Sequence, residues 1–149
     1  MRVLPIALAT IGQTEEVVRA ACKCLLFMVQ DALREKDNNY SLNQHVHPLA
    51  AKHPEFKFRV IKPISNPSGY VVATVQAVFQ SFFDTDDFAR CLIDVVNRGG
   101  DAETTVAIAG MLAGALYGLD TIPDLWLKIL DTDIAHQCSQ QAMELMLLN

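Results

Sequence analysis

Long apolar segments, a surplus of positive charge and cysteines in metal-binding spacing are all missing from this 149-residue chain. The strongly apolar run at residues 106–119 has 14 residues, whereas a helix needs about 20 to cross a bilayer. The apolar run near Met1 is also too short for a signal peptide. Acidic residues outnumber Lys and Arg by 17 to 12, and nucleic-acid binding needs a basic face. We therefore expect neither a membrane nor a nucleic acid as the main partner.

Cysteine is scarce, with only Cys22, Cys24, Cys91 and Cys138 present. Their spacing fits no zinc motif, so we expect free thiols in a reducing cytoplasm. Apolar residues make up 51% of the chain and charged residues 19%, a balance that excludes disorder and can supply one buried core. The sequence therefore predicts a single cytoplasmic domain over residues 1–149.

Apolar residues recur at helical spacing along most of the chain, and strands do not alternate with helices. The spacing predicts an amphipathic helix of roughly 20 residues after Thr14, which is the expected N-cap. Further helices are expected over residues 69–83, from a Thr85 cap to a Gly99 C-cap, over 102–117, from Pro123 in a first turn, and over 133–147. The expected fold class is all-α.

Residues 37–68 interrupt this pattern, because they contain Pro48, Pro54, Pro63 and Pro67 and lack helical periodicity. They are expected to be mostly loop, with a short extended piece at residues 56–61. Small residues crowd the segment 102–117, where Gly110 and Gly114 lie one turn apart. Because glycine costs about 1 kcal/mol relative to alanine inside a helix, we predict a central helix that its neighbours approach closely along this stripe.

The stretch GGDAETT, residues 99–105, opens the apolar helix, and two interpretations fit its polar residues. As capping residues, Asp101 would accept a backbone N–H and Glu103 would favour the positive end of the helix dipole. As a site, Asp101, Glu103 and Thr104 would offer hard oxygen ligands suited to Mg²⁺, Mn²⁺ or Ca²⁺. Spacing alone favours the capping interpretation.

For the other candidate groups, spacing favours ordinary roles. The histidines His45, His47 and His53 are expected as solvated loop residues rather than as ligands of a borderline metal. A solvated loop with two buried aromatic rings is favoured over a basic–aromatic patch for a nucleotide or RNA. That patch comprises Lys52, Lys57, Arg59 and Lys62 with Phe56 and Phe58. Tyr70 follows Gly69 at the start of a helix, and it either stacks on a ligand ring or packs at the core or rim.

Residues 68–127 combine four short motifs. These are Ser-Gly-Tyr-Val at 68–71, Gly-Gly-Asp-x-acid-Thr at 99–104, Ala-Gly-x-x-Ala-Gly-Ala-x-Tyr-Gly at 109–118, and Ile-Pro-x-x-Trp at 122–126. Together they resemble the C-terminal part of the ADP-ribosylglycohydrolase family. The stretch MRVLPIAL at the N-terminus resembles a mid-domain segment of the same family more weakly.

The resemblance implies an all-α enzyme, an orthogonal multi-helix bundle with two Mg²⁺ or Mn²⁺ ions at its centre. Such enzymes hydrolyse the glycosidic bond between ADP-ribose and a protein side chain. The family's Asp-x-Asp-Thr metal ligands fall on Asp101, Glu103 and Thr104. Its Gly-Tyr contact to ADP-ribose falls on Gly69 and Tyr70.

The chain also departs from the family pattern. Glu103 stands where the family usually has Asp, and Ala73 stands where an acid is common. The family's N-terminal half, with a Thr-Asp-Asp motif that completes the metal site and an assisting glutamate, has no counterpart, and neither has its His-Pro stretch. We therefore expect an incomplete bundle with weak or no hydrolase activity alone. The alternative is a non-catalytic remnant or subunit that binds ADP-ribose or completes its site with another chain, and exposed apolar faces would favour self-association.

Overall fold

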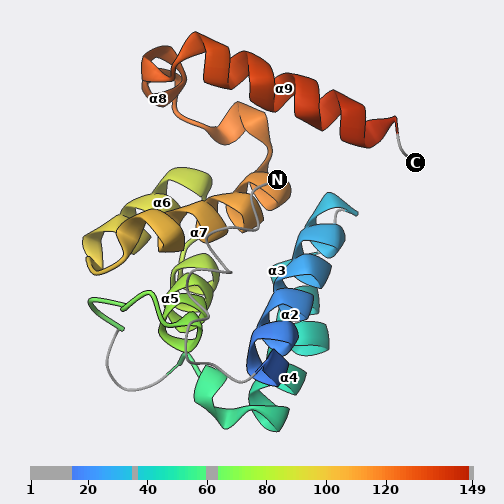
Figure 1. Ribbon diagram of the computed structural model, residues 1–149, viewed down its shortest axis with the longest axis vertical. Helices are drawn as coiled ribbons and strands as arrows, with labels where there is room; N and C mark the ends of the chain where they lie inside the picture. The colour runs from blue at the N-terminus through green and yellow to red at the C-terminus, as the bar shows by residue number, and fades with distance from the viewer. Residues whose placement is uncertain (1–14, 35–36, 60–63, 148–149) are drawn as a thin grey trace.

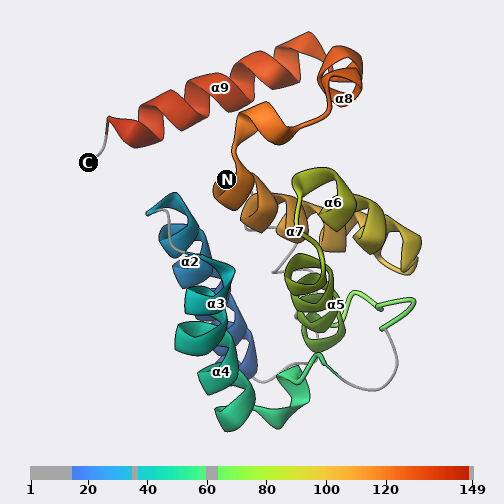
Figure 2. The ribbon, with the colours of Figure 1, turned by 180° about the vertical axis from the view of Figure 1, so that it is seen from behind.

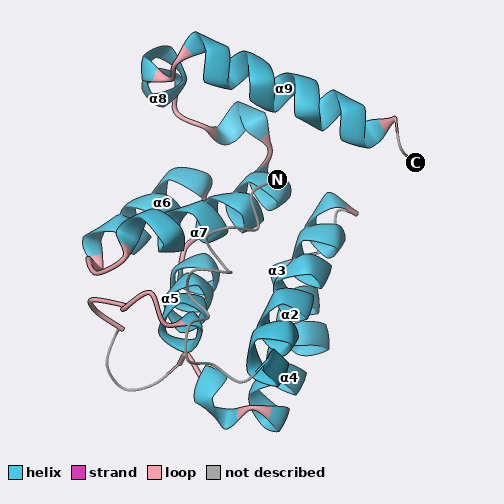
Figure 3. Cartoon of the chain, viewed as in Figure 1, coloured by secondary structure: helices cyan, strands magenta, loops and turns pink. Residues whose placement is uncertain are grey.

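A computed structural model describes residues 15–34, 37–59 and 64–147. Within these ranges the chain is helical and forms no strand (Figure 3), so the all-α prediction is confirmed. No described helix combines the length and the apolar character that a bilayer span requires.

One helix, α7, lies at the centre of the arrangement (Figures 1 and 2) and packs against α2, α5 and α6. This confirms the predicted central helix. The short helix α8 and the longer α9 lie beyond α6 and α7 at one end of the molecule. In chain order the elements are α2 (Glu15–Leu33), α3 (Asn38–Ser41), a π-helical turn (Leu42–Val46), α4 (His47–Lys52), a 3-10 turn (Pro54–Phe56), α5 (Val71–Asp84), α6 (Phe88–Asn97), α7 (Ala102–Tyr117), a 3-10 turn (Leu119–Thr121), α8 (Asp124–Ile129) and α9 (Thr132–Met146).

The core forms where α2, α5, α6 and α7 meet. From α5, Phe79 and Val78 are fully buried, and from α7, Leu112 is fully buried beside them in the same cluster. Ten of the 14 residues of α5 are buried, and seven of these ten are apolar. Burying one large apolar side chain stabilises the fold by about 1.5–3 kcal/mol. Packing in the shared core therefore fixes where the amino ends of α5 and α7 lie.

The prediction of a loop over residues 37–68 is wrong for residues 38–56, which are mostly helical. Pro48 and Pro54 each stand in the first turn of a helical element, where the missing N–H is not needed. Asp37 caps α3 by accepting the backbone N–H of Tyr40 at 2.7 Å. Of the predicted extended piece, residues 57–59 are non-helical, whereas residues 60–61 lie outside the described ranges.

The predicted helix ends are close but shifted. The N-cap of α6 is Asp87, which accepts the Arg90 N–H at 2.7 Å. Thr85 is not a cap there, because its hydroxyl donates to the Ser81 carbonyl and closes α5 instead. Gly99 has the predicted positive φ, 72°, but follows the C-cap residue Arg98. Pro123 is the N-cap of α8 rather than part of its first turn, and Thr14 lies outside the described residues.

The explanation offered for the two helical glycines is also wrong. A Cβ atom on Gly110 would meet only Leu92 Cδ2, at 3.9 Å, and one on Gly114 would meet only Phe88 Cε2, at 3.9 Å. These are ordinary van der Waals distances to side chains, so no backbone among the described residues approaches closely along this stripe. Both positions have room for a methyl group.

Candidate functional site

The five residues singled out from the sequence lie at the amino ends of α5 and α7. Gly69 and Tyr70 precede α5, while Asp101, Glu103 and Thr104 open α7. The loop before α5 lies against the turn between α6 and α7, because two backbone hydrogen bonds join them. Asn66 N donates to Arg98 O at 2.7 Å, and Asp101 N donates to Pro67 O at 2.8 Å. We call this contact the loop–turn junction.

Two consecutive glycines make the turn possible. Gly99 and Gly100 have φ of 72° and 65°, in the left-handed region that favours glycine. A Cβ on Gly100 would lie 2.3 Å from Pro67 O, so no side chain fits between the turn and the loop. The GG pair is therefore a steric requirement of the loop–turn junction.

The junction brings Gly69 against the carboxylate of Asp101. A Cβ atom on Gly69 would lie 2.9 Å from Asp101 Oδ2, closer than real Cβ contacts come. The absence of a side chain at Gly69 thus leaves Asp101 in place. Structure and sequence agree that these two motifs, distant along the chain, share one location.

Asp101 is the N-cap of α7, as the capping interpretation predicts. Its Oδ1 accepts the backbone N–H of Thr104 at 3.3 Å, and its carbonyl accepts the hydroxyl of the buried Thr105 at 2.7 Å. Asp101 is half-buried, and no described residue donates a hydrogen bond to Oδ2. The capping role uses one carboxylate oxygen, so the other is free for a ligand.

The remaining two candidate ligands follow on the first turn of α7. Glu103 is exposed and has no ion pair among the described residues, and Thr104 is half-buried. Their oxygens are of the kind that Mg²⁺ and Mn²⁺ prefer. However, the described ranges contain no cluster of three His, Cys, Asp or Glu side chains able to hold a metal, and the positive end of a helix dipole opposes a cation. The donors fit in kind, and a full coordination shell needs further oxygens.

Tyr70 does not pack in the core, because its side chain is 49% exposed, so stacking on a ligand ring and packing at the rim remain as the two alternatives. Its backbone carbonyl accepts the Thr74 N–H at 3.0 Å, which fixes the residue as the N-cap of α5. The ring therefore projects from a rigid position beside Gly69 and is free to stack on a flat group.

Sequence reasoning missed Arg98, which ties the junction to the core. Its guanidinium is 9% exposed and pairs with Asp94, and Nε also donates to Ser81 Oγ at 2.9 Å. Its Nη1 donates to Gln80 Oε1 at 2.7 Å and to Ile64 O at 3.1 Å, so it holds the start of the loop before α5. The i, i+4 spacing of Asp94 and Arg98 was the available signal.

The structure also describes the other sequence candidates, which are the histidines and the two aromatic rings. His45 and His47 lie on helical turns rather than in a loop, so their predicted setting is wrong, and His45 Nε2 lies 2.6 Å from Asp31 Oδ2. Phe56 and Phe58 are buried, as predicted.

All four cysteines are free, as predicted. Burial raises the pKa of the Cys24 thiol to about 12 and that of Cys91 to about 11. Neither thiol is therefore a nucleophile near neutral pH.

Comparison with known proteins links this geometry to one enzyme family. The family model ADP-ribosylglycohydrolase matches residues 27–148, which include the loop–turn junction. The chain is 38% identical to the ADP-ribosyl-[dinitrogen reductase] glycohydrolase of Rhodospirillum rubrum, over 99% of this chain and 55% of that protein. It is 32% identical to the ADP-ribosylarginine hydrolase Tri1 of Serratia proteamaculans (strain 568), over 72% of this chain and 31% of that protein.

A Tri1 hydrolase of Pseudomonas putida (strain GB-1) is 30% identical, over 72% of this chain and 30% of that protein. The chain therefore spans 55% of the Rhodospirillum rubrum relative and about a third of the two Tri1 hydrolases. Each match thus covers only part of the relative, and the Rhodospirillum rubrum match extends over nearly the whole of this chain.

Proposed function

The chain belongs to the ADP-ribosylglycohydrolase family, and we propose that its loop–turn junction is the C-terminal part of a site for ADP-ribose joined to a protein side chain. The reaction class is hydrolysis of the glycosidic bond. The named activities of the relatives support this substrate class, since one acts on dinitrogen reductase and the others on ADP-ribosylarginine. Four free cysteines favour a reducing cytoplasm as the location.

The observation that carries the proposal is the contact of Gly69 with Asp101. It places an exposed tyrosine ring and a carboxylate with one free oxygen at the amino ends of two adjacent helices. An ADP-ribosyl group presents the matching chemistry, because its adenine offers a flat face and its riboses offer hydroxyl groups. Tyr70 would stack on the ring system, and the Asp101 region would lie toward the hydroxyl groups.

Divalent metals enter the proposal through Asp101, Glu103 and Thr104. Bound Mg²⁺ or Mn²⁺ would hold ribose hydroxyls and help to position the attacking water. Asp101 would contribute Oδ2 while Oδ1 continues to cap α7, so ligation would not cost the cap. Glu103 reaches one methylene further than Asp, and Mg²⁺ is strict about geometry, so Mn²⁺ is the better probe.

Because one set of three oxygens does not complete a binuclear site, we propose that the isolated chain has little or no turnover. The test is release of ADP-ribose from ADP-ribosylated arginine with Mn²⁺ present, compared with the Asp101→Asn variant. Robust turnover by the wild-type chain, lost in the variant, would show that the site is complete and would overturn this part of the proposal.

A second candidate, a subunit that associates through apolar faces, is favoured by α8 and α9. Large apolar side chains stand out from these helices, and they include Leu125 (68% exposed), Ile129 (76%) and Met143 (60%). Light scattering coupled to size exclusion tests this role. A stable dimer that the double change Leu125→Ser and Ile129→Ser dissociates would support it, and a monomer at high concentration would refute it.

A further inference from the structure

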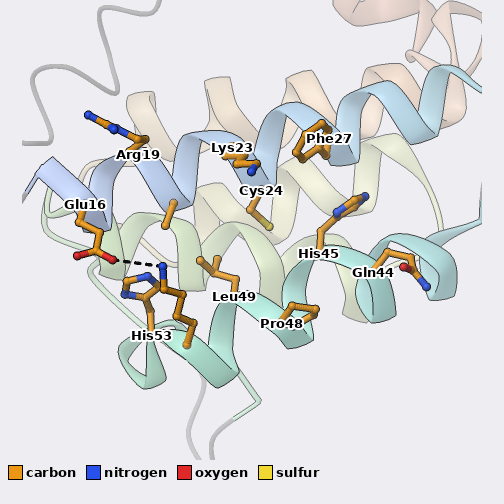
Figure 4. A pocket seen from close by; sticks show the side chains of 12 residues that line it. Glu16, Arg19, Lys23, Cys24, Phe27, Gln44, His45, Pro48, Leu49 and His53 are labelled. Atoms are coloured by element: carbon orange, nitrogen blue, oxygen red, sulfur yellow. Dashed lines mark ion pairs between the residues drawn. The ribbon is translucent and has the colours of Figure 1, made fainter.

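A groove separate from the loop–turn junction lies between α2 and α4 (Figure 4). It has a volume of about 500 Å³, within the roughly 300–1,000 Å³ that small-molecule sites occupy. Its floor is apolar, because Cys24 and Leu49 are buried beneath it. None of the residues of the junction lines it. We call it the α2–α4 groove.

Positive charge gathers around this groove although the chain as a whole is acidic, with a net charge of −5. Three cations line it, Arg19 and Lys23 from α2 and Lys52 from α4, and Glu16 is the one acid among the lining residues. Lys52 Nζ pairs with Glu16 at 3.2 Å, and Arg19 pairs with Glu15 beside the groove. All four side chains of these two pairs are at least 69% exposed, so the pairs are weak and exchange readily.

Lys23 has no carboxylate partner among the described residues. Its Nζ lies 5.6 Å from the centroid of the Phe27 ring, and that ring stacks on His45 at 5.5 Å. Asp31 holds His45 from the far side, with 2.6 Å between His45 Nε2 and Asp31 Oδ2. One end of the groove therefore presents the Lys23 ammonium group over the Phe27 ring, which in turn stacks on the His45 ring (Figure 4).

The other end of the groove holds a polar atom without a hydrogen-bond partner. His53 is 9% exposed, and its Nε2 is buried with no hydrogen-bond partner. The other ring nitrogen, Nδ1, lies 3.7 Å from Glu55 Oε1, which leaves Nε2 to face away from that acid. A buried polar atom without a partner is rare in proteins, so at the wall of a groove it points to a missing ligand atom. In Figure 4, His53 and Glu16 lie at the same end of the groove, and Lys52, the ion-pair partner of Glu16, directly precedes His53 in the chain, so an anion there would meet both cation and imidazole.

We propose that the α2–α4 groove binds a small molecule that carries phosphate groups. Cations approach from two facing helices, which suits an anion with several oxygens better than a single carboxylate contacted from one side. The phosphate displaces Glu16 from Lys52, and a rotation of the His53 ring turns its buried Nε2 toward the groove, where it donates a hydrogen bond to a phosphate oxygen. The organic part of the ligand lies on the apolar floor and against the Phe27 ring, near Lys23.

The test uses inorganic pyrophosphate as the probe, titrated into the full chain at low salt with EDTA present. EDTA removes divalent metals, so binding in this groove and the metal-assisted binding proposed at Asp101 are measured separately. Calorimetry gives the affinity, and the ¹⁵N resonances of the imidazoles report on His53. We expect binding that shifts the His53 Nε2 resonance and weakens as salt is raised.

Charge reversal on the two walls provides the decisive variants. Lys23→Glu and Lys52→Glu should each weaken pyrophosphate binding about fivefold or more, because each replaces an attractive charge by a repulsive one. Both side chains are exposed, so the variants should fold. Lys128→Glu, on exposed α8 away from the groove, is the matched control and should change the affinity by less than about twofold.

Three results would overturn the proposal. One is no detectable pyrophosphate binding at low salt. The second is an equal loss in Lys23→Glu and Lys128→Glu, which would mean attraction to overall charge alone. The third is binding that leaves the His53 resonances unmoved. The variant Asp101→Asn should bind pyrophosphate as the wild type does, so failure of the proposed function would leave this result unchanged.

Discussion

Replacing Gly100 by alanine tests whether the loop–turn junction holds the candidate site together. Gly100 has φ of 65°, a conformation that costs an L-residue roughly 1–2 kcal/mol. The new Cβ would lie 2.3 Å from Pro67 O and 2.6 Å from Asn66 C, and these are backbone atoms that no rotamer change can move.

Relief of that clash requires the loop to separate from the turn. The separation removes the Asp101 N–H bond to Pro67 O, 2.8 Å long, which is worth about 1 kcal/mol. Together with the strain, the expected loss is about 2–3 kcal/mol of unfolding free energy. For a chain of this size that corresponds to a fall in Tm of roughly 4–12 °C.

Urea and thermal unfolding measure this loss, with Gly110→Ala as the matched control. Gly110 is helical, and its Cβ would meet only Leu92 Cδ2, at 3.9 Å, so alanine there should stabilise the fold by up to about 1 kcal/mol. A Gly100→Ala variant within about 0.5 kcal/mol of the wild type would refute the steric argument.

Three further predictions concern Gly69, Arg98 and the cysteines. Gly69→Ala should change the unfolding free energy by less than about 1 kcal/mol, because Asp101 Oδ2, 2.9 Å from the new Cβ, belongs to a side chain that can shift. Calorimetry should show weaker Mn²⁺ binding by this variant. Unchanged Mn²⁺ binding would contradict the placement of the ligand oxygen. Arg98→Met should lower the unfolding free energy by about 2–3 kcal/mol, because it leaves Asp94 and Gln80 without their shared donor. The control is Arg90→Met, which replaces an exposed arginine and should cost under about 1 kcal/mol. Urea unfolding measures both variants. At pH 8 a thiol reagent should label exposed Cys138 rapidly and spare Cys24, whose pKa is raised to about 12 by burial. The thiol of Cys24 has a lower pKa, 9.0, in the unfolded chain than in the folded one. The stability that Cys24 contributes should therefore persist below pH 9 and fall as the pH rises toward 12. An unfolding free energy that stays constant between pH 9 and 12 would contradict this expectation.

Helical periodicity and turn chemistry were enough to predict most of the fold. The long amphipathic repeat of α2 and the Asp101-to-Gly118 limits of α7 match the predicted segments because one apolar face and one cap decide each of them. Residues 38–56 were mispredicted because Pro48 and Pro54 were counted as breakers, although both stand in first turns. Thr85 and Asp87 are both good caps by type, and in the structure Thr85 closes α5 while Asp87 caps α6.

The candidate site was predictable in its residues but not in its construction. The sequence motifs placed Gly69 and Asp101 in one family pattern, yet nothing in their spacing shows that Gly69 contacts Asp101 Oδ2. The i, i+4 pair with Asp94 signalled only part of the role of Arg98, because its other partners, Gln80, Ser81 and Ile64, come from other segments. The same limit applies to His53, whose unpartnered Nε2 emerges only from three-dimensional packing.

The central claim is that Asp101 and Tyr70 form part of a metal-assisted ADP-ribose site. Calorimetric titration of the chain with ADP-ribose, with and without Mn²⁺, tests it most directly. We expect binding that Mn²⁺ strengthens, that Asp101→Asn returns to its metal-free level and that Tyr70→Ala weakens in both conditions. No binding of ADP-ribose with or without Mn²⁺ would contradict it.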